Sequence, residues 1–76
     1  MNISLTQLNE GQIGYVSNLV GNAPMKRRLQ DLGIISGTAI ECLQKGPWGD
    51  PIAYKIRGTI IALRIEDANN IKCILF

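Results

Sequence analysis

The sequence predicts a mainly β fold, a small and partly open barrel of about five to six short strands with one short α-helix. Short runs rich in β-branched and aromatic residues are separated by glycine-rich turns. Only one stretch has apolar residues at helical spacing. The chain has 76 residues and contains no linker or repeat, so residues 1–76 are expected to form a single domain.

The first part of the chain predicts two strands. Residues 5–8 are read as a short first strand, and a glycine-containing turn at 9–11 leads to a second strand at 13–19. The segment Gly-Asn-Ala-Pro at 21–24 then ends this β region, because glycine and proline interrupt strands.

A short helix is expected to follow. Pro24 suits the first helical position, where a missing N–H group costs nothing. Met25, Leu29 and Leu32 come at the spacing of one helix face, and Gly33 is typical of the residue just past a helix end. A helix of about nine residues is marginal alone in water, so packing must hold it in place.

The rest of the chain has the period of strands. Further strands are expected at residues 38–44, 52–57, 59–65 and 71–75. In the second of these, Ile52, Tyr54 and Ile56 alternate with small or charged residues, as in a strand with one buried face. The expected connections are a loop at 45–51, a tight hairpin turn at Arg57-Gly58 and a turn at 66–70. An SH3-like barrel fits this length and number of strands, and it hides strand edges that would otherwise promote aggregation.

Composition and charge exclude several classes of protein. The chain is 46% hydrophobic and 18% charged, which is ordinary for a globular domain and excludes a disordered chain. A net charge of +2 gives a weak field, whereas nucleic-acid-binding domains concentrate positive charge on one face. The start of the chain lacks the pattern of a secretion signal, and no apolar run is long enough to cross a membrane. We therefore expect a cytoplasmic protein without direct membrane insertion.

The residue inventory argues against an enzyme. The chain has no histidine, which removes the usual general base and metal ligand, and it has no phosphate-binding glycine motif. Among the carboxylates only Glu66 and Asp67 are adjacent, and they form no convincing acid–base pair. We expect no catalytic residue, no metal ligand and no cofactor, although a weak site at Glu66 and Asp67 stays open. Cys42 and Cys73 are interpreted as buried core thiols, because each lies in a strand-like run beside apolar residues and the chain contains no C-x-x-C motif. A disulfide between them stays open, although the expected cytoplasmic location argues against it.

A basic cluster on the predicted helix is the first candidate for function. Lys26, Arg27 and Arg28 fall in its first half and Asp31 in its last turn, opposite to the arrangement that the helix dipole favours. A local rule that is broken without compensation often marks a functional site. Two interpretations stay open: a solvated face with an Arg27–Asp31 ion pair, or a patch for an acidic partner surface.

The loop Gly-Pro-Trp-Gly-Asp-Pro at 46–51 is the second candidate. It holds Trp48, the only tryptophan, between two turn-forming residues. Trp48 either folds back to cap one end of the barrel or stays exposed as an anchor for a partner, since tryptophan is enriched at binding hot spots. Asp50 precedes a proline, which keeps it extended or in a turn.

Together, two stretches of the chain resemble the ferrous-iron transport protein A family of bacteria. The first reads Arg27-Arg28-Leu29-x-Asp31-Leu32-Gly33-Ile34-x-x-Gly37-x-x-Ile40. The second reads Pro47-x-Gly49-Asp50-Pro51-x-Ala53-Tyr54-x-Ile56-Arg57-Gly58-x-x-Ile61-Ala62-Leu63-Arg64-x-x-Asp67-Ala68-x-x-Ile71. The opening Leu8-x-x-Gly11-x-x-Gly14-x-Val16 is also similar to that family, so the resemblance covers nearly the whole chain.

The resemblance implies an SH3-like barrel and a non-catalytic cytoplasmic accessory of ferrous-iron uptake. Its implied partner is the membrane ferrous-iron transporter, which carries a cytosolic GTP-binding domain; weak transition-metal binding and a homodimer through an uncovered strand edge stay open. Carried onto this sequence, the residues that look like core are Leu29, Leu32, Ile61 and Leu63, and those that look like turn residues are Gly33, Gly37, Gly49 and Pro51. The candidate partner-binding residues are Lys26, Arg27, Arg28, Trp48 and Asp50, and we hypothesise that the helix start and the 46–51 loop form one surface.

Two other functions are open to a small β-barrel of this kind. A nucleic-acid-binding barrel would stack bases on aromatics among basic residues, but Tyr15, Trp48, Tyr54 and Phe76 do not alternate with the basic residues. A metal-sensing module like the C-terminal domain of iron-dependent repressors would need ligands that this chain lacks. Neither rival explains the residues as well as a protein-binding module does.

Overall fold

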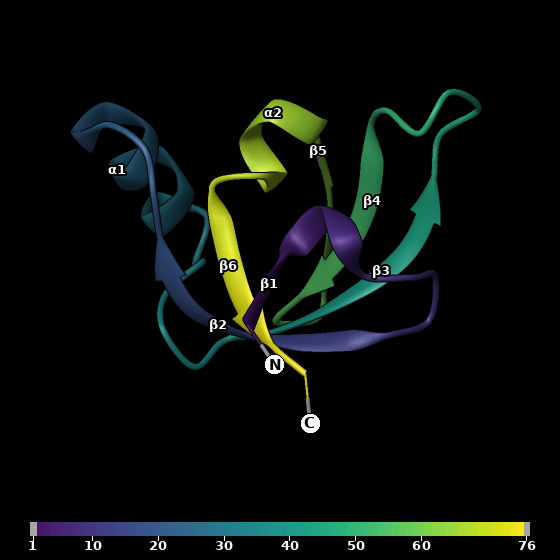
Figure 1. Ribbon diagram of the computed structural model, residues 1–76, viewed down its shortest axis with the longest axis horizontal. Coiled ribbons are helices and arrows are strands. Elements are labelled where there is room, and N and C mark those ends of the chain that lie inside the picture. The colour runs from purple at the N-terminus through teal and green to yellow at the C-terminus, as the bar shows by residue number, and fades with distance from the viewer. Residues whose placement is uncertain (1, 76) are drawn as a thin grey trace.

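The computed structural model describes residues 2–75, which form one six-stranded antiparallel sheet in the order β1-β6-β2-β3-β4-β5. The strands are β1 (Asn2–Ser4), β2 (Ile13–Leu19), β3 (Ala39–Lys45), β4 (Ile52–Ile56), β5 (Thr59–Leu63) and β6 (Ile71–Ile74). The helical elements are the 3-10 helix η1 (Leu5–Gln7) and the α-helices α1 (Ala23–Asp31) and α2 (Ile65–Ala68). Figure 1 shows the sheet wrapping around the core, with α1 at one side and α2 above. The predicted mainly β fold is confirmed. Phe76 lies outside the described residues.

The core is built from the inward faces of the strands. Ile40, Cys42 and Cys73 are wholly buried, and in β4 the alternating residues Ile52, Tyr54 and Ile56 are buried as the period of two predicted. The buried Tyr54 hydroxyl donates a hydrogen bond to the Leu5 carbonyl at 3.4 Å, which satisfies its polar atom. Full burial of an isoleucine-sized apolar side chain contributes about 1.5–3 kcal/mol, so the inward-facing residues of the strands dominate the stability of the fold.

The helix α1 begins and ends with recognisable caps. The side chain of Asn22 accepts a hydrogen bond from the Met25 amide at 2.9 Å, and Pro24 lies in the first turn, one residue after the first helical position that was predicted for it. At the other end, Gly33 has a φ of 91° and Ile34 donates its amide to the Leu29 carbonyl at 3.1 Å, which is a Schellman motif. This closing turn places Leu29 and Ile34 in the core.

Leu32 is not a core residue, so that prediction is wrong. It is the C-cap of α1 and is 42% exposed. The helical period ends there, because the left-handed Gly33 reverses the chain and points the next apolar residue, Ile34, inward instead. The predicted core residue Leu63 is buried, and Ile61 is partly buried against the core.

Two predicted elements differ from the structure. Residues 5–8 are not a strand: β1 ends at Ser4, and η1 follows because Ser4 and Gln7 cap each other in a capping box. The expected turn at 66–70 is largely the single-turn helix α2, which begins at Ile65 and therefore ends β5 two residues early.

The turn between β4 and β5 was predicted correctly. Arg57 and Gly58 have φ values of 51° and 79°, and Ile56 faces Thr59 across the turn. Positive φ at both central residues defines a type I′ turn, the tight hairpin whose twist matches that of the strands. The two-residue turn fixes the register of β5 on β4.

Candidate functional site

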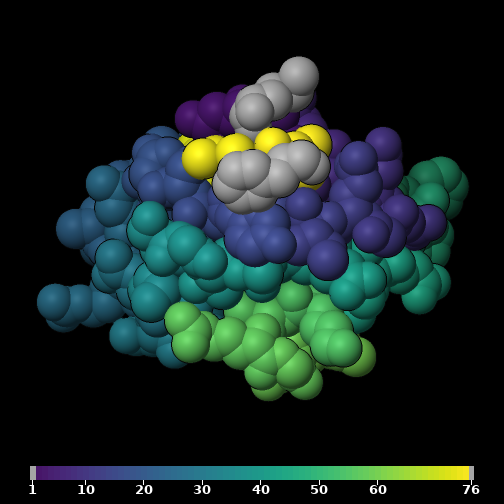
Figure 2. Space-filling model, turned by 90° about the horizontal axis from the view of Figure 1, so that it is seen from below, coloured from purple at the N-terminus to yellow at the C-terminus, as the bar shows by residue number. Residues whose placement is uncertain are grey.

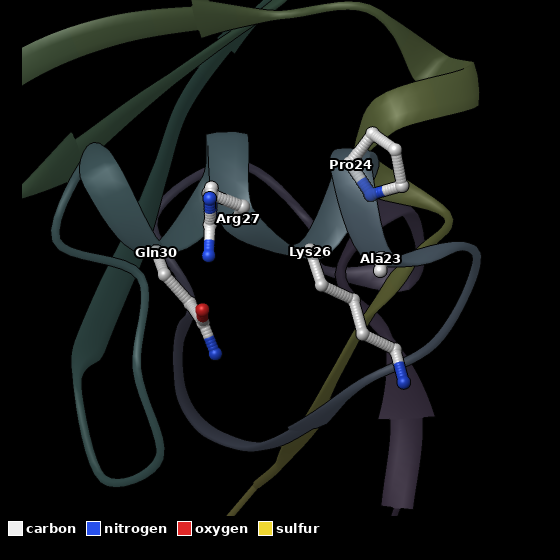
Figure 3. A pocket seen from close by; sticks show the side chains of 5 residues that line it. All are labelled: Ala23, Pro24, Lys26, Arg27 and Gln30. Carbon is white, nitrogen blue, oxygen red and sulfur yellow. The ribbon is translucent and has the colours of Figure 1, made fainter.

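The helix α1 presents an open hollow of about 600 Å³ to solvent. We call it the α1 surface, and its lining residues are Ala23, Pro24, Lys26, Arg27 and Gln30. Lys26 and Gln30 are one turn apart, and Figure 3 shows their side chains extending in the same direction from the helix. Among residues 2–75, neither Lys26 nor Arg27 forms an ion pair. These two predicted site residues therefore lie together, and their charges are available to a partner.

Arg28, the third basic residue of the predicted cluster, has a different role. Its Nη2 atom lies 2.7 Å from Oδ1 of Asp67 in α2. The same nitrogen lies 3.4 Å from the sulfur of Met25. Arg28 therefore ties α1 to α2, while the predicted Arg27–Asp31 pair is not among the ion pairs of the described chain. The positive charge of Arg28 is thus compensated by Asp67.

Trp48 is the most exposed large apolar side chain of the described residues. It is 92% exposed on the loop between β3 and β4, so the interpretation as a cap on the barrel is wrong. The Gly46 amide donates to the Pro51 carbonyl at 2.9 Å, and the Gly49 amide donates to the Gly46 carbonyl at 2.8 Å. The loop is therefore closed on itself and holds Trp48 out in solvent.

A second, smaller hollow lies beside this loop. We call it the β5 groove; its volume is about 290 Å³. Its lining residues are Gln44, Lys45, Gly46, Pro47, Pro51, Ala53 and Ala62. No local pattern in the sequence indicates this groove, because it joins residues from β3, the loop, β4 and β5. Five of its seven lining residues are glycine, alanine or proline; the other two are Gln44 and Lys45, and Lys45 carries the only charge of this lining.

Asp50 has a structural contact within the chain. Its Oδ1 atom accepts a hydrogen bond from the Ile65 amide at 3.1 Å. Ile65 is the first residue of α2, and the N-cap residue Arg64 makes no side-chain hydrogen bond to the helix. Asp50 therefore satisfies an amide that would lack a partner at the helix start, and its negative charge suits that end of the helix.

Replacing Asp50 with alanine should lower the free energy of unfolding by about 1 kcal/mol, the usual cost of losing a side-chain cap. The expected loss comes from the Ile65 amide, which should also exchange its proton faster in the variant. Urea unfolding followed by circular dichroism measures the first effect, and amide hydrogen exchange measures the second. An unchanged exchange rate at Ile65 would contradict the capping role.

The structure does not bring the two predicted candidates into one surface. In Figure 1, α1 and the loop between β3 and β4 lie at opposite ends of the longest axis of the molecule, with α2 between them. The hollows beside them share no lining residue. The chain therefore offers two separate surfaces, a basic one on α1 and an apolar one around Trp48 and the β5 groove.

The cysteines are core thiols, as predicted. Cys42 and Cys73 are both free and wholly buried. Burial raises the pKa of both thiols above its ordinary value; for Cys42, Lys45 opposes this shift in part. Burial also raises the pKa of Tyr54, and the two neighbouring thiols add to that shift. These groups therefore stay protonated at neutral pH, which makes the thiols poor nucleophiles and poor metal ligands.

The described residues contain no evident metal centre. Between residues 2 and 75, no three Cys, His, Asp or Glu side chains come together in a group that could hold a metal ion. Of the adjacent carboxylates, Asp67 binds Arg28, and Glu66 lies 3.7 Å from Arg64. None of the helices in this part of the chain is long and apolar enough to cross a membrane.

Comparison with known proteins gives a family and a fold. Residues 3–74 match the FeoA domain family. A curated relative, an Fe(2+) transport protein A/Fe(2+) transporter FeoB fusion protein of Porphyromonas gingivalis, is 29% identical over 68 residues. That match covers 90% of this chain but only 8% of the fusion protein.

Two solved structures are similar over almost the whole chain. The NMR structure of a FeoA-like protein from Clostridium acetobutylicum is 32% identical, has a TM-score of 0.91, and is matched over 99% of this chain and 87% of its own. The zinc complex of FeoA from Stenotrophomonas maltophilia, named as a prokaryotic SH3 domain protein, is 28% identical with a TM-score of 0.83, over 95% and 89% of the two chains. The SH3-like barrel predicted from the sequence is thus confirmed, and this chain belongs to the FeoA domain family.

Proposed function

We propose that this protein is a non-catalytic accessory of ferrous-iron uptake that binds the membrane ferrous-iron transporter through the transporter's cytosolic GTP-binding region. The observation that carries the proposal is the relative in Porphyromonas gingivalis, in which a related domain and transporter FeoB are parts of one fusion protein. Domains that are joined in one chain in one organism often act together as separate chains in another. A partner region in the cytosol would place this protein in the cytoplasm.

The α1 surface supports this proposal as the site of contact. Lys26 and Arg27 carry positive charges that no acid among residues 2–75 neutralises, and Ala23 and Pro24 add apolar area beside them. A hollow with an apolar rim, the exposed Arg27 and the partly exposed Lys26 suits an acidic patch on a partner, because complementary charge speeds association and fixes orientation. Arg28 and Asp50 are left out of the contact, because they stabilise α2 from within the chain.

The proposed activity needs no bound metal or cofactor. The thiols are buried, Asp67 is engaged by Arg28, and the chain has no histidine. Hard and soft metal ions alike would find few free donors. We therefore expect the affinity for the transporter domain to be the same with and without a metal chelator.

Charge reversal on the α1 surface tests the proposal. The Lys26→Glu/Arg27→Glu variant should bind the GTP-binding domain at least about tenfold more weakly, which corresponds to about 1.4 kcal/mol. Its midpoint of thermal unfolding should hardly change, since neither side chain forms an ion pair in the described chain. The measurement is an NMR titration of ¹⁵N-labelled protein with the domain, with and without nucleotide, in which shifts should cluster on residues 24–31.

The matched control is Lys55→Glu/Arg64→Glu, which changes the net charge by the same amount on exposed residues away from α1. It should bind like the parent protein. Equal loss of binding in both double variants would show that the net charge of the protein, and not the α1 surface, determines the affinity. Absence of binding both to the isolated domain and to the full-length transporter in detergent would overturn the proposed function itself.

A further inference from the structure

The strand β5 forms an uncovered edge of the sheet. The sheet order leaves β1 and β5 at its two ends, and among residues 2–75 neither has a partner strand on its outer side. Natural edge strands are usually protected by short length, charges, proline or bulges. The three-residue β1 is protected by its length, whereas β5 (Thr59–Leu63) has five uncharged residues, no proline and an uninterrupted register on β4.

The register shows which backbone groups of β5 point outward. The tight turn makes Ile56 and Thr59 the first hydrogen-bonded pair, and such pairs alternate with non-bonded ones along an antiparallel ladder. Thr59, Ile61 and Leu63 therefore direct their amide and carbonyl groups toward β4. Ile60 and Ala62 direct theirs to the open edge, where another strand could bind them.

The side chains of the same two residues form a knob and a hole. Ile60 is 68% exposed and stands opposite Lys55 on the outer face of the sheet. Ala62 lies opposite Ala53 on that face, and both line the β5 groove. Figure 2 views the molecule from below, with the green segment that includes β5 lying along one border of it. The large exposed side chain of Ile60 thus lies two residues from a hollow that is lined on this side by the small side chains of Ala53 and Ala62.

We propose that β5 pairs with β5 of a second copy of this chain, antiparallel and about a twofold axis through Ile61. In this register, Ile60 of each copy stands opposite Ala62 of the other, and the two residues exchange backbone hydrogen bonds. Each Ile60 then enters the β5 groove of the other copy, beside Ala53. The pairing continues the sheet across both molecules, which would bury the outward backbone groups of Ile60 and Ala62.

The occupant is a second copy because the edge complements itself. A twofold interface requires that one patch carry both halves of each contact, and β5 carries the isoleucine and the alanine in the required order. No residue of β5 is charged, so no like charges stand opposite each other in the pair. The interface is small, and we expect a dissociation constant between about 10 µM and 1 mM. The proposal does not depend on transporter binding.

Sedimentation equilibrium over a range of protein concentrations tests it. The average mass should rise toward that of a dimer as the concentration approaches about 1 mM. Ile60→Lys should raise the dissociation constant at least about tenfold, because a lysine on an edge strand prevents pairing. Ala62→Leu should do the same without adding charge, because it fills the groove that receives Ile60. Both positions are exposed, so both variants should fold.

The matched control is Ile35→Lys, at an isoleucine that is 46% exposed on the loop after α1. It should associate like the parent protein. In the parent, amide exchange at Ile60 and Ala62 should slow as concentration rises, while that at α1 stays constant. A parent protein that remains monomeric at about 1 mM, or an Ile35→Lys variant that loses association as fully as Ile60→Lys, would overturn the proposal.

Discussion

Replacing Gly14 with alanine should lower the free energy of unfolding by about 3 kcal/mol, the upper part of the usual range for overpacking a core. Backbone propensity alone predicts the opposite, since alanine in a strand costs less conformational entropy than glycine by roughly 0.5–1 kcal/mol. Packing decides the sign of the change in unfolding free energy at this position. A Cβ atom on Gly14 would lie 2.8 Å from the Cys73 sulfur, 3.2 Å from its Cβ and 3.4 Å from Cδ2 of Leu8.

The Cys73→Ala background provides the control for this prediction. Removing the Cys73 sulfur alone should cost about 1–2 kcal/mol through the cavity it leaves. In the double variant the new methyl group of residue 14 occupies part of that space, so the combined loss should be smaller than the sum of the two single losses by at least about 1 kcal/mol. Urea unfolding of all four proteins measures this coupling. Strict additivity would show that Gly14 is required for a reason other than the neighbouring sulfur.

The strands could be predicted because each carries its own pattern. The alternation in β4 identified Ile52, Tyr54 and Ile56 as core, and the Arg57-Gly58 pair identified the turn that follows. These signals are local, and tertiary contacts only reinforce them. Both one-turn helices were missed. The capping box of η1 is itself local, so Ser4 and Gln7 gave a usable sign. The helix α2 is held at its start by Asp50, 15 positions away in the sequence, and no window of local sequence contains that contact.

The candidate site could be predicted only in part, for the same reason. The exposure of Arg27 and the partial exposure of Lys26 follow from helix periodicity. The pairing of Arg28 with Asp67 joins residues 39 positions apart, so the sequence could not separate Arg28 from its neighbours. The β5 edge depends on the order of strands in the sheet, which the strand patterns do not specify. The resemblance to a family agreed with the fold that the strand pattern predicted, but it did not show that α1 and the loop carrying Trp48 lie on two separate surfaces.

Replacing Gly46 with alanine should lower the free energy of unfolding by about 2–3 kcal/mol. A Cβ atom there would lie 2.8 Å from the Asp50 carbonyl oxygen and 3.0 Å from that of Pro51. Both are backbone atoms, so no rotation of a flexible side chain can relieve the contact. The loop must open instead, and it loses the hydrogen bond from the Gly46 amide to the Pro51 carbonyl.

An opened loop should affect two more features, which makes the prediction specific. Asp50 should move away from the Ile65 amide, whose exchange should become faster, and the β5 groove should lose its wall at Pro47 and Pro51.

The control is Gly49→Asn in the same loop. No atom lies within 4 Å of a Cβ added at residue 49, and asparagine tolerates the φ of 79°, so the loss of unfolding free energy should stay below about 1 kcal/mol. Circular dichroism is the suitable probe of unfolding, because Trp48 is already exposed in the folded protein and its emission should change little. An equal loss of unfolding free energy in the two variants would contradict the prediction. It would mean that the loop accommodates a Cβ atom at residue 46 and that its closure does not hold Asp50 against α2.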